Sequence, residues 1–318
     1  MSAAYEPPWW LPGGHLQTIY PALRPAPRVR FTRERWEAPD GDFVDVDWSG
    51  PADAARLLVL FHGLEGSSAS HYARALAAHA NRLGWRCAVP HFRGCSGEPN
   101  RLPRAYHSGD SAEIDWVLGR FGERHPAMRR CAAGVSLGGN ALLKWLGERD
   151  EGAAPLIARA AAISAPLDLA AAGNTLDRGL NRRLYARMFL RSLKRKALEK
   201  FSRFPRLLDA AAVRASATLR AFDDAVTAPL HGFDGTDDYW ARASSMPWLG
   251  RIAIPTLILN ARNDPFLPAA ALPHAGQVSR SVVLDFPPQG GHAGFVSGTF
   301  PGSQDWLSTR ILEFLSAP

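Results

Sequence analysis

The chain has 318 residues, 46% of them hydrophobic and 10% aromatic, which allows a large core and excludes a disordered protein. Its three cysteines are too few and odd in number for a disulfide framework, and no apolar run approaches the roughly 18 residues of a membrane-spanning helix. The net charge is +7 and the N-terminus lacks the pattern of a signal peptide, so we expect a soluble, cytoplasmic protein.

From about residue 43 the chain alternates strand-like runs with helical patterns. Strands are predicted at residues 43–48, 57–61, 85–90, 130–133, 160–164, 252–260 and 281–286. Helices are predicted at residues 70–83, 107–121, 140–148 and 303–315. This alternation predicts an α/β fold with a mostly parallel sheet flanked by helices. A Pro/Arg-rich stretch at residues 21–30 predicts an extended arm.

The alternation stops between residues 166 and 246, where helical patterns replace strands. An insertion between two late core strands predicts a helical cap or lid. Residues 1–165 and 247–318 would then form one α/β core, with an N-terminal arm over about residues 1–40.

The first candidate for chemistry is Ser136, in the G-x-S-x-G pentapeptide at residues 134–138. An apolar run precedes it and a helical pattern follows it, so the serine lies on a predicted strand-to-helix turn. Such a turn exposes a nucleophile at the edge of the sheet. Because roughly one random chain in six of this composition would contain the pentapeptide, the prediction depends on partners elsewhere in the chain.

Those partners follow in the order that a serine–acid–histidine triad requires. Asp264 comes just after the predicted strand at 252–260, and His292 follows the strand at 281–286. Both lie where parallel strands end, which is where sites form in open α/β sheets. Two other acids lie near strand ends, but Asp285 falls among strand residues and Asp168 precedes the cap. We therefore predict Asp264 as the acid and His292 as the base.

An oxyanion hole needs two main-chain N–H donors. One should be Leu137, directly after the predicted nucleophile, and the other Leu64, in the loop after the strand at 57–61. The glycines at 63 and 66 also suggest a phosphate-binding loop, but the chain lacks the accompanying G-K-[ST] motif.

Histidines could instead bind a metal, but His62, His91 and His292 do not have the spacing of a metal site. We expect His62 to pack the loop that it precedes. No cofactor and no metal are expected.

The excess positive charge lies in one segment of the predicted cap. Residues 177–206 contain eleven Lys or Arg and two acids, whereas the rest of the chain carries slightly more acidic than basic residues. Arg183, Arg187 and Arg191 recur every four residues beside a helical apolar pattern. A solvated helix face explains this pattern, and an interfacial helix that contacts anionic membrane lipid is the sharper alternative. No nucleic-acid-reading motif accompanies the charge, so no nucleic-acid partner is expected.

Five segments of the chain resemble the YheT-like α/β-hydrolases, the AB hydrolase 4 family, which includes eukaryotic abhydrolase-domain esterases and lipases. They are residues 8–18 (PWWLPGGHLQT), 62–67 (HGLEGS), 91–100 (HFRGCSGEPN), 106–110 (YHSGD) and 261–266 (ARNDPF). The resemblance implies an α/β-hydrolase fold and hydrolysis of short acyl esters or monoacylglycerol-like lipids, with Ser136, Asp264 and His292 as the triad. The first and third segments have no role that the sequence reveals.

Together these features predict a serine carboxylesterase or lipase-like hydrolase that forms an acyl-enzyme on a small ester or acyl-lipid substrate. The same triad could catalyse acyl transfer, or cleave a thioester or an amide. A lipid-binding protein at the membrane surface, with a vestigial triad, is the alternative outside enzymes.

Overall fold

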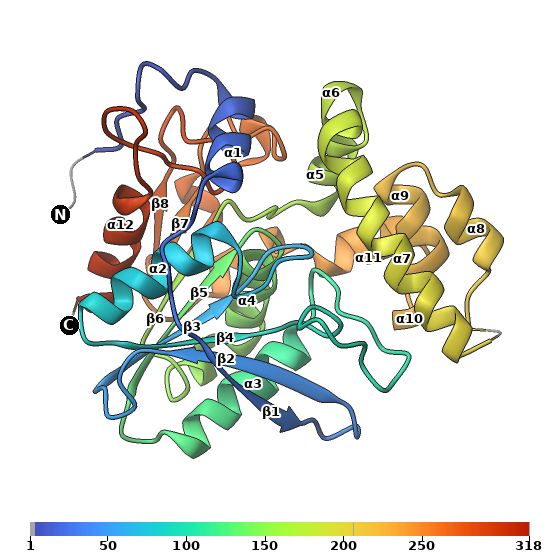
Figure 1. Ribbon diagram of the computed structural model, residues 1–318, viewed down its shortest axis with the longest axis horizontal. Coiled ribbons are helices and arrows are strands. Elements are labelled where there is room, and N and C mark those ends of the chain that lie inside the picture. Colours follow the sequence, from blue (N-terminus) through green and yellow to red (C-terminus); the bar gives the residue numbers. More distant parts are fainter. Residues whose placement is uncertain (1–3, 206, 318) are drawn as a thin grey trace.

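The computed structural model describes residues 4–205 and 207–317. A single eight-stranded sheet lies between two layers of helices, and a separate group of helices projects beyond one end of it (Figure 1). In chain order the strands are β1 (Thr32–Glu37), β2 (Phe43–Ser49), β3 (Arg56–Phe61), β4 (Arg86–Pro90), β5 (Arg129–Val135), β6 (Arg159–Ile163), β7 (Thr256–Leu259) and β8 (Val282–Asp285). Their spatial order is β1-β2-β4-β3-β5-β6-β7-β8, in which β1 and β2 are antiparallel and the strands from β4 to β8 are parallel. The predicted α/β-hydrolase architecture is thus confirmed.

The central strand β3 shows why the sheet is covered on both faces. Leu57, Val59 and Phe61 pack into one apolar cluster, and Leu58 and Leu60 pack into another. Successive side chains of a strand point to opposite faces, so a continuous apolar run has to be buried on both.

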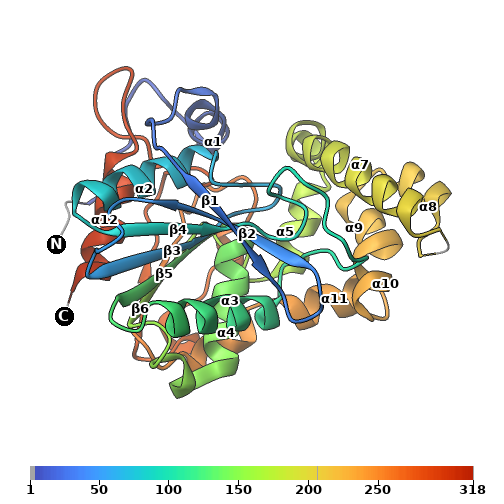
Figure 2. The same ribbon diagram turned by 60° about the horizontal axis from the view of Figure 1, so that its bottom comes forward.

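Two pairs of helices bury these faces. Helices α3 (Ser111–Arg124) and α4 (Leu137–Arg149) contribute to the first cluster, and α2 (His71–Arg82) and α12 (Asp305–Ser316) contribute to the second. The two views place these pairs on opposite sides of the sheet (Figures 1 and 2).

The predicted arm is partly wrong. Pro21, placed in an extended stretch, lies in the last turn of helix α1 (Gly14–Leu23), where its missing N–H forfeits only one hydrogen bond. Strand β1 was not predicted, because it is an edge strand with one buried apolar side chain, Trp36. What holds it in the sheet is its pairing with β2, where Arg33 forms an ion pair with Asp47.

Between β6 and β7 the residues described form helices joined by loops, without a strand, and these helices make up the group beyond the sheet (Figure 1). These helices are α5 (Leu169–Leu176), α6 (Gly179–Asn181), α7 (Arg187–Arg203), α8 (Ala210–Ala215), α9 (Leu219–Phe222), α10 (Ala228–His231) and α11 (Thr236–Ala243). Most of them share an apolar cluster that also includes Phe266 from the loop after β7, whereas α11 packs on the start of α5 in a second, smaller cluster. We refer to this group of helices as the cap. In the described part of the chain, no helix has the length and apolarity needed to cross a membrane.

Candidate active site

Ser136 lies on a tight turn between β5 and α4. Its backbone is left-handed, with φ 53° and ψ −121°, which is costly for a residue with a side chain. The glycines allow the helix to approach the sheet: a Cβ on Gly138 would lie 2.5 Å from the main-chain oxygens of Phe61 and His62. The pentapeptide therefore folds as the sequence predicts, with the serine at the first turn of a helix.

Asp264 and His292 are brought together from the loops after β7 and β8. The Asp264 Oδ2 lies 2.8 Å from the His292 Nδ1, and the Asp264 Oδ1 accepts a 2.8 Å hydrogen bond from the N–H of Phe266. The Phe266 ring stacks on the imidazole at 4.0 Å between centroids. The carboxylate is thus buried and fixed, and it orients the imidazole.

Ser136 and His292 line one cavity of about 670 Å³ between the core and the cap. The other two acids have structural partners: Asp285 forms an ion pair with Arg310 at 2.7 Å, and Asp168 caps the first turn of α5. The structure therefore places the three predicted residues at one edge of the sheet and gives the competing acids other tasks.

The two predicted N–H donors, Leu64 and Leu137, also line this cavity. The loop after β3 passes close to Ser136, since a Cβ built on Gly63 would lie 3.1 Å from the Ser136 Cβ. On either side of Leu64 the main chain is held by tyrosine hydroxyls, because the Gly63 N–H donates to Tyr72 and the Glu65 N–H donates to Tyr106. The loop that carries Leu64 is therefore held rigidly beside the serine.

His62 is a structural residue. It is fully buried, its Nδ1 lies 2.8 Å from the Gly63 carbonyl, and its Nε2 accepts a hydrogen bond from the N–H of Phe92. Burial lowers the pKa of His62 to about 3, so the ring stays neutral. It connects the Leu64 loop to the loop after β4.

No cluster of three metal-ligating side chains occurs among the residues described. The histidines considered as ligands are engaged separately: His91 bonds Asp47 at 3.0 Å, and His292 bonds Asp264.

Comparison with known proteins fits this geometry. Residues 56–299 match the family described as the alpha/beta hydrolase fold, and the chain is 40% identical to a protein of Escherichia coli named "Putative esterase YheT" over 99% of this chain and 94% of that one. The chain belongs to the α/β-hydrolase family. It is also 29% identical to human "Phospholipase ABHD3", over 100% of this chain and 80% of that protein. Among solved structures, the Pyrococcus furiosus esterase Pf2001 shares the fold with a TM-score of 0.59 at 13% identity, over 92% of this chain and 97% of that one.

The N-terminal segment, whose role the sequence does not reveal, supports the loop that carries His292. The buried Gln17 of α1 accepts hydrogen bonds from the N–H of Gly290 and from the side chain of Asn263, both at 2.9 Å. Thr18 accepts a 2.9 Å hydrogen bond from the N–H of His292 itself. One turn of α1 therefore fixes the loops of both predicted triad partners, and only the three-dimensional structure could reveal it.

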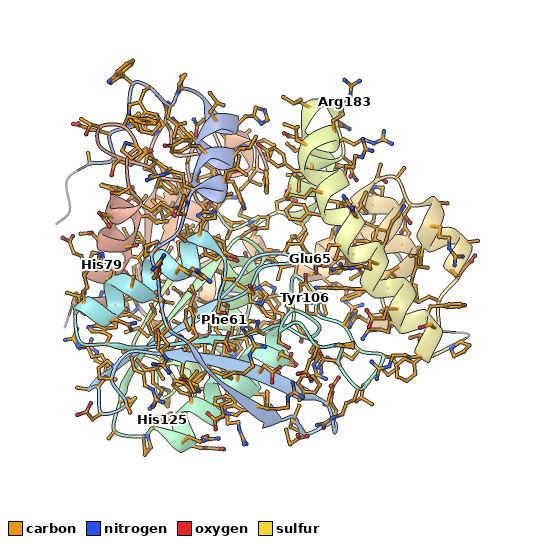
Figure 3. The ribbon with its side chains drawn as sticks, in the orientation of Figure 1. Phe61, Glu65, His79, Tyr106, His125 and Arg183 are labelled. Carbon is orange, nitrogen blue, oxygen red and sulfur yellow. The ribbon has the colours of Figure 1, made fainter. Side chains whose placement is uncertain are left out.

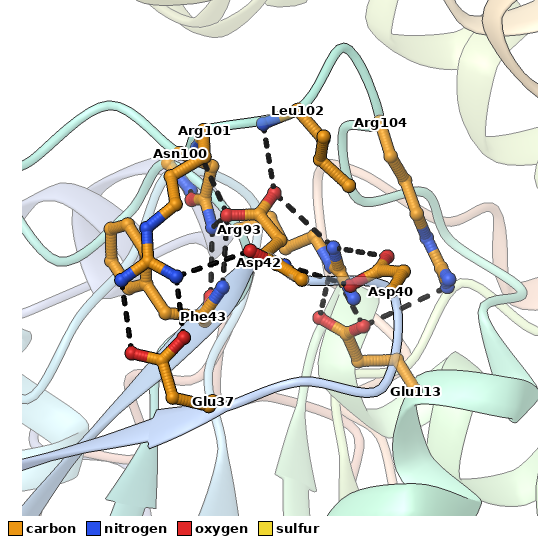
Figure 4. Close-up of polar contacts among 12 residues, drawn as sticks. Glu37, Asp40, Asp42, Phe43, Arg93, Asn100, Arg101, Leu102, Arg104 and Glu113 are labelled. Atoms are coloured by element: carbon orange, nitrogen blue, oxygen red, sulfur yellow. Dashed lines mark hydrogen bonds and ion pairs between the residues drawn. The ribbon is translucent and has the colours of Figure 1, made fainter.

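The segment at residues 91–100 forms a wall of the cavity, and buried charges hold it in place (Figure 4). The Arg93 guanidinium contacts Glu113 at 2.9 Å, Asp40 at 2.7 Å and Asp42 at 3.2 Å. The Asn100 side chain donates to Asp42 at 2.8 Å. Because these carboxylates come from the β1–β2 turn and from α3, the wall is fixed to the core.

Glu65, next to Leu64, connects the cap to the core. Its carboxylate accepts 2.8 Å hydrogen bonds from the Tyr106 hydroxyl and the Lys196 ammonium, and a further one from Ser192. Lys196 and Ser192 belong to α7, whereas Glu65 and Tyr106 lie at the end of the core that faces the cap (Figure 3). The loop that carries Leu64 and helix α7 are thus joined through the Glu65 carboxylate.

Strained backbone is concentrated around the cavity. Among the residues described, six besides glycine have a left-handed backbone: Glu65, Ser136, Asp150, Ser164, Ala293 and Phe295. All but Asp150 lie at or next to the site. Such strain costs of order 1–3 kcal/mol per residue and persists only where the surroundings impose it.

Proposed function

We propose that the protein is a serine hydrolase that cleaves carboxylic esters through an acyl-enzyme. The observation that carries the proposal is the 2.8 Å contact between Asp264 and the Nδ1 of His292, in a cavity that Ser136 also lines. With Nδ1 engaged, Nε2 is the ring nitrogen available to the serine hydroxyl. This is the division of roles in a serine–histidine–aspartate triad.

In the proposed reaction, His292 takes the Ser136 proton as the oxygen attacks the ester carbonyl. The N–H groups of Leu64 and Leu137 stabilise the oxyanion of the tetrahedral intermediate. His292 then donates the proton to the leaving alcohol, and the C–O bond of the ester breaks. Water, deprotonated by His292, releases the acid and restores the serine.

The cavity supports an acyl substrate. Its cap wall is mostly apolar and includes Leu169, Leu176, Phe189, Leu193, Phe222, Val226 and Leu230. Its volume of about 670 Å³ lies within the usual range for pockets that enclose a small organic ligand. Together with the esterase and phospholipase named among the relatives, this favours a short-chain ester or a monoacylglycerol-like lipid.

Replacing Ser136 with alanine tests the proposal. Hydrolysis of p-nitrophenyl esters should fall by about 10⁴-fold or more, and labelling by a fluorophosphonate should be lost. Ser202→Ala, on an exposed part of α7, is the matched control and should keep both. Turnover of these esters by Ser136→Ala at the wild-type rate would contradict the mechanism.

A substrate screen then separates the remaining reactions of the same triad. Esters from acetate to long-chain acyl, the matching thioesters, and an added alcohol acceptor would be compared under one condition. We expect hydrolysis of oxygen esters to dominate. Labelling of Ser136 without turnover of any substrate would instead favour a lipid-binding protein with a vestigial triad.

A further inference from the structure

The exposed apolar side chains of this protein are concentrated on one surface. Seven of the nine large apolar side chains that are exposed in the described part of the chain lie there: Trp9, Leu16, Leu23, Leu180, Leu184, Met188 and Phe300. Trp9 is 90% exposed and Phe300 is 73% exposed. We call this region the α1–α6 surface. It is formed by these seven residues, which come from the segment before α1, α1 itself, the loop before α12 and the start of the cap.

Side-chain contacts make the α1–α6 surface continuous. His15 of α1 bonds the Tyr185 hydroxyl of the cap at 3.0 Å, and the chain neighbours of these two residues, Leu16 and Leu184, are both exposed. On the other side, the Tyr20 hydroxyl donates to the main chain beside Phe300. Both views show α1 and the start of the α6–α7 segment along the same edge of the molecule (Figures 1 and 2).

Within the cap, this surface is one side of a helix. Leu180, Leu184 and Met188 recur every four residues through α6, the π turn Arg182–Ala186 and the first turn of α7. Tyr185 and Leu190, on the opposite side, are buried in the cap cluster. The helical segment therefore has two apolar sides. One is buried in the cap cluster, and the other, with Leu180, Leu184 and Met188, is not covered by any part of the described chain.

Arginines border this apolar side. Arg178, Arg182, Arg183, Arg187 and Arg191 are all exposed. Arg183 lies near the tip of the cap (Figure 3). Over residues 4–205 and 207–317, none of the five is within ion-pair distance of a carboxylate. No direct ion pair within these described residues therefore neutralises their charge.

We propose that the α1–α6 surface docks the protein peripherally on a bilayer that contains anionic lipid. Apolar side chains at the centre with arginines around them match acyl chains below a layer of negative headgroups. A second copy of the chain fits less well, because a two-fold contact would bring the same arginines together. Docking does not require the proposed ester chemistry, so the two can fail separately.

The inner side of α7 explains why such docking would matter. Phe189 and Leu193 line the cavity, whereas Leu184 and Met188 project from the outer side of the same helical segment. The helix in contact with lipid is therefore also a wall of the substrate cavity.

Vesicle binding of the full chain tests the proposal. We expect the protein to float with vesicles of phosphatidylcholine and phosphatidylglycerol in equal parts, and to bind pure phosphatidylcholine much more weakly. Added salt should weaken the binding, because it screens the arginines. Ser136→Ala should bind as the wild type does, which separates docking from catalysis.

Two sets of variants locate the surface. Leu184→Ser and Met188→Ser should each weaken the partition coefficient by about tenfold, since each removes one apolar side chain from the interface. Arg183→Gln and Arg187→Gln should each weaken it by about fivefold, the equivalent of about 1 kcal/mol per basic residue near an anionic surface. The matched controls are Leu83→Ser and Val283→Ser for the apolar set and Arg280→Gln for the charged set; all three residues are exposed elsewhere.

The proposal is overturned if the wild type does not bind the mixed vesicles, or if the control variants lose as much binding as the surface variants. Light scattering tests whether a second copy of the chain binds this surface instead. If the protein self-associates, Leu184→Ser abolishes the self-association and no vesicles are bound, the surface is a dimer contact. Because the altered side chains are exposed, their variants should melt within a few degrees of the wild type.

Discussion

Two cations that line the cavity, Arg93 of the core and Lys200 of the cap, are held differently. On the core side, the buried Arg93 is surrounded by carboxylates, including Glu113 at 2.9 Å. On the cap side, Lys200 of α7 donates at 3.0 Å to the main-chain oxygens of Leu102 and Arg104, its partners among the residues described, and burial lowers its pKa to about 8. Pairing with carboxylates fixes a charge far more firmly than contact with neutral carbonyls.

The two regions accordingly have different roles. The core holds the predicted triad residues in place by buried contacts, as preorganised chemistry requires. The cap is connected to that core by hydrogen bonds that involve α6, α7 and α11, and the contact between Glu65 and Lys196 is the one ion pair between cap and core among the residues described. We therefore expect substitutions on the core side to lower the rate of chemistry, and substitutions in the cap to change closure and stability.

The largest effect beyond the triad residues is expected at Gln17. Gln17→Met removes the acceptor for the N–H of Gly290 and for Asn263, so the loops around His292 and Asp264 lose a shared support. We expect kcat to fall by about 100-fold with little change in KM, the cost of a misplaced catalytic group.

Active-site titration with a fluorophosphonate reports the fraction of Gln17→Met that is folded and competent, so the kcat can be corrected for unfolding. Gln277→Met, an exposed glutamine of the core, is the control. An unchanged kcat per titrated site would exclude a positioning role for Gln17.

A smaller effect is expected where the cap meets the core. Glu65→Gln and Lys196→Met each remove the ion pair between the Leu64 loop and α7, and we expect kcat/KM to fall roughly fivefold in each. The double variant should be little worse than either single one, because both break the same contact. Lys194→Met, which removes a cation of α7 that contacts only a carbonyl, should leave kcat/KM unchanged. Additive losses in the double variant would contradict a shared contact.

The smallest effect concerns stability. The half-buried Asp223 of the cap accepts hydrogen bonds from Thr227 and Trp240, and desolvation of its carboxylate raises its pKa to about 7, from an ordinary value near 3.9. The folded state therefore retains a proton that the unfolded state loses, and stability falls as the pH rises from about 4 through 7. Asp223→Asn cannot ionise, so its Tm should exceed that of the wild type by a few degrees at about pH 8, and by less at about pH 5.

Thermal unfolding at the two pH values measures this difference. Asp237→Asn, whose carboxylate is 83% exposed, is the control and should show no such dependence. A gain in Tm of the same size at both pH values would contradict the assignment to the Asp223 proton.

Much of the core could be predicted because its signals are local. The apolar run of β3 and the turn at Ser136 depend on neighbouring residues only, and both appear where the sequence places them. The same holds for Asp264 and His292, whose positions after strands suffice to bring them to one edge of the sheet.

The parts that could not be predicted depend on partners far away in the chain. Strand β1 has the composition of a surface segment and is stabilised through Asp45 and Asp47 on its neighbour. In the sequence, nothing distinguishes Gln17 from other helix residues. Its role depends on the packing of α1 against the loop at 289–294, which lies more than 270 residues further along the chain. Glu65 likewise gains its role only when the cap folds over it.

The left-handed residues around the cavity have a consequence for how the protein could be made more heat-resistant. Ser136, Glu65, Ser164, Ala293 and Phe295 each hold strain that glycine would relieve. Glycine would also remove side-chain contacts, such as the packing of the buried Phe295 on Tyr5 and Trp306 and the hydrogen bond between Ser164 and Ala293. At most of these positions, relief of backbone strain alone is therefore no direct route to a more heat-resistant protein.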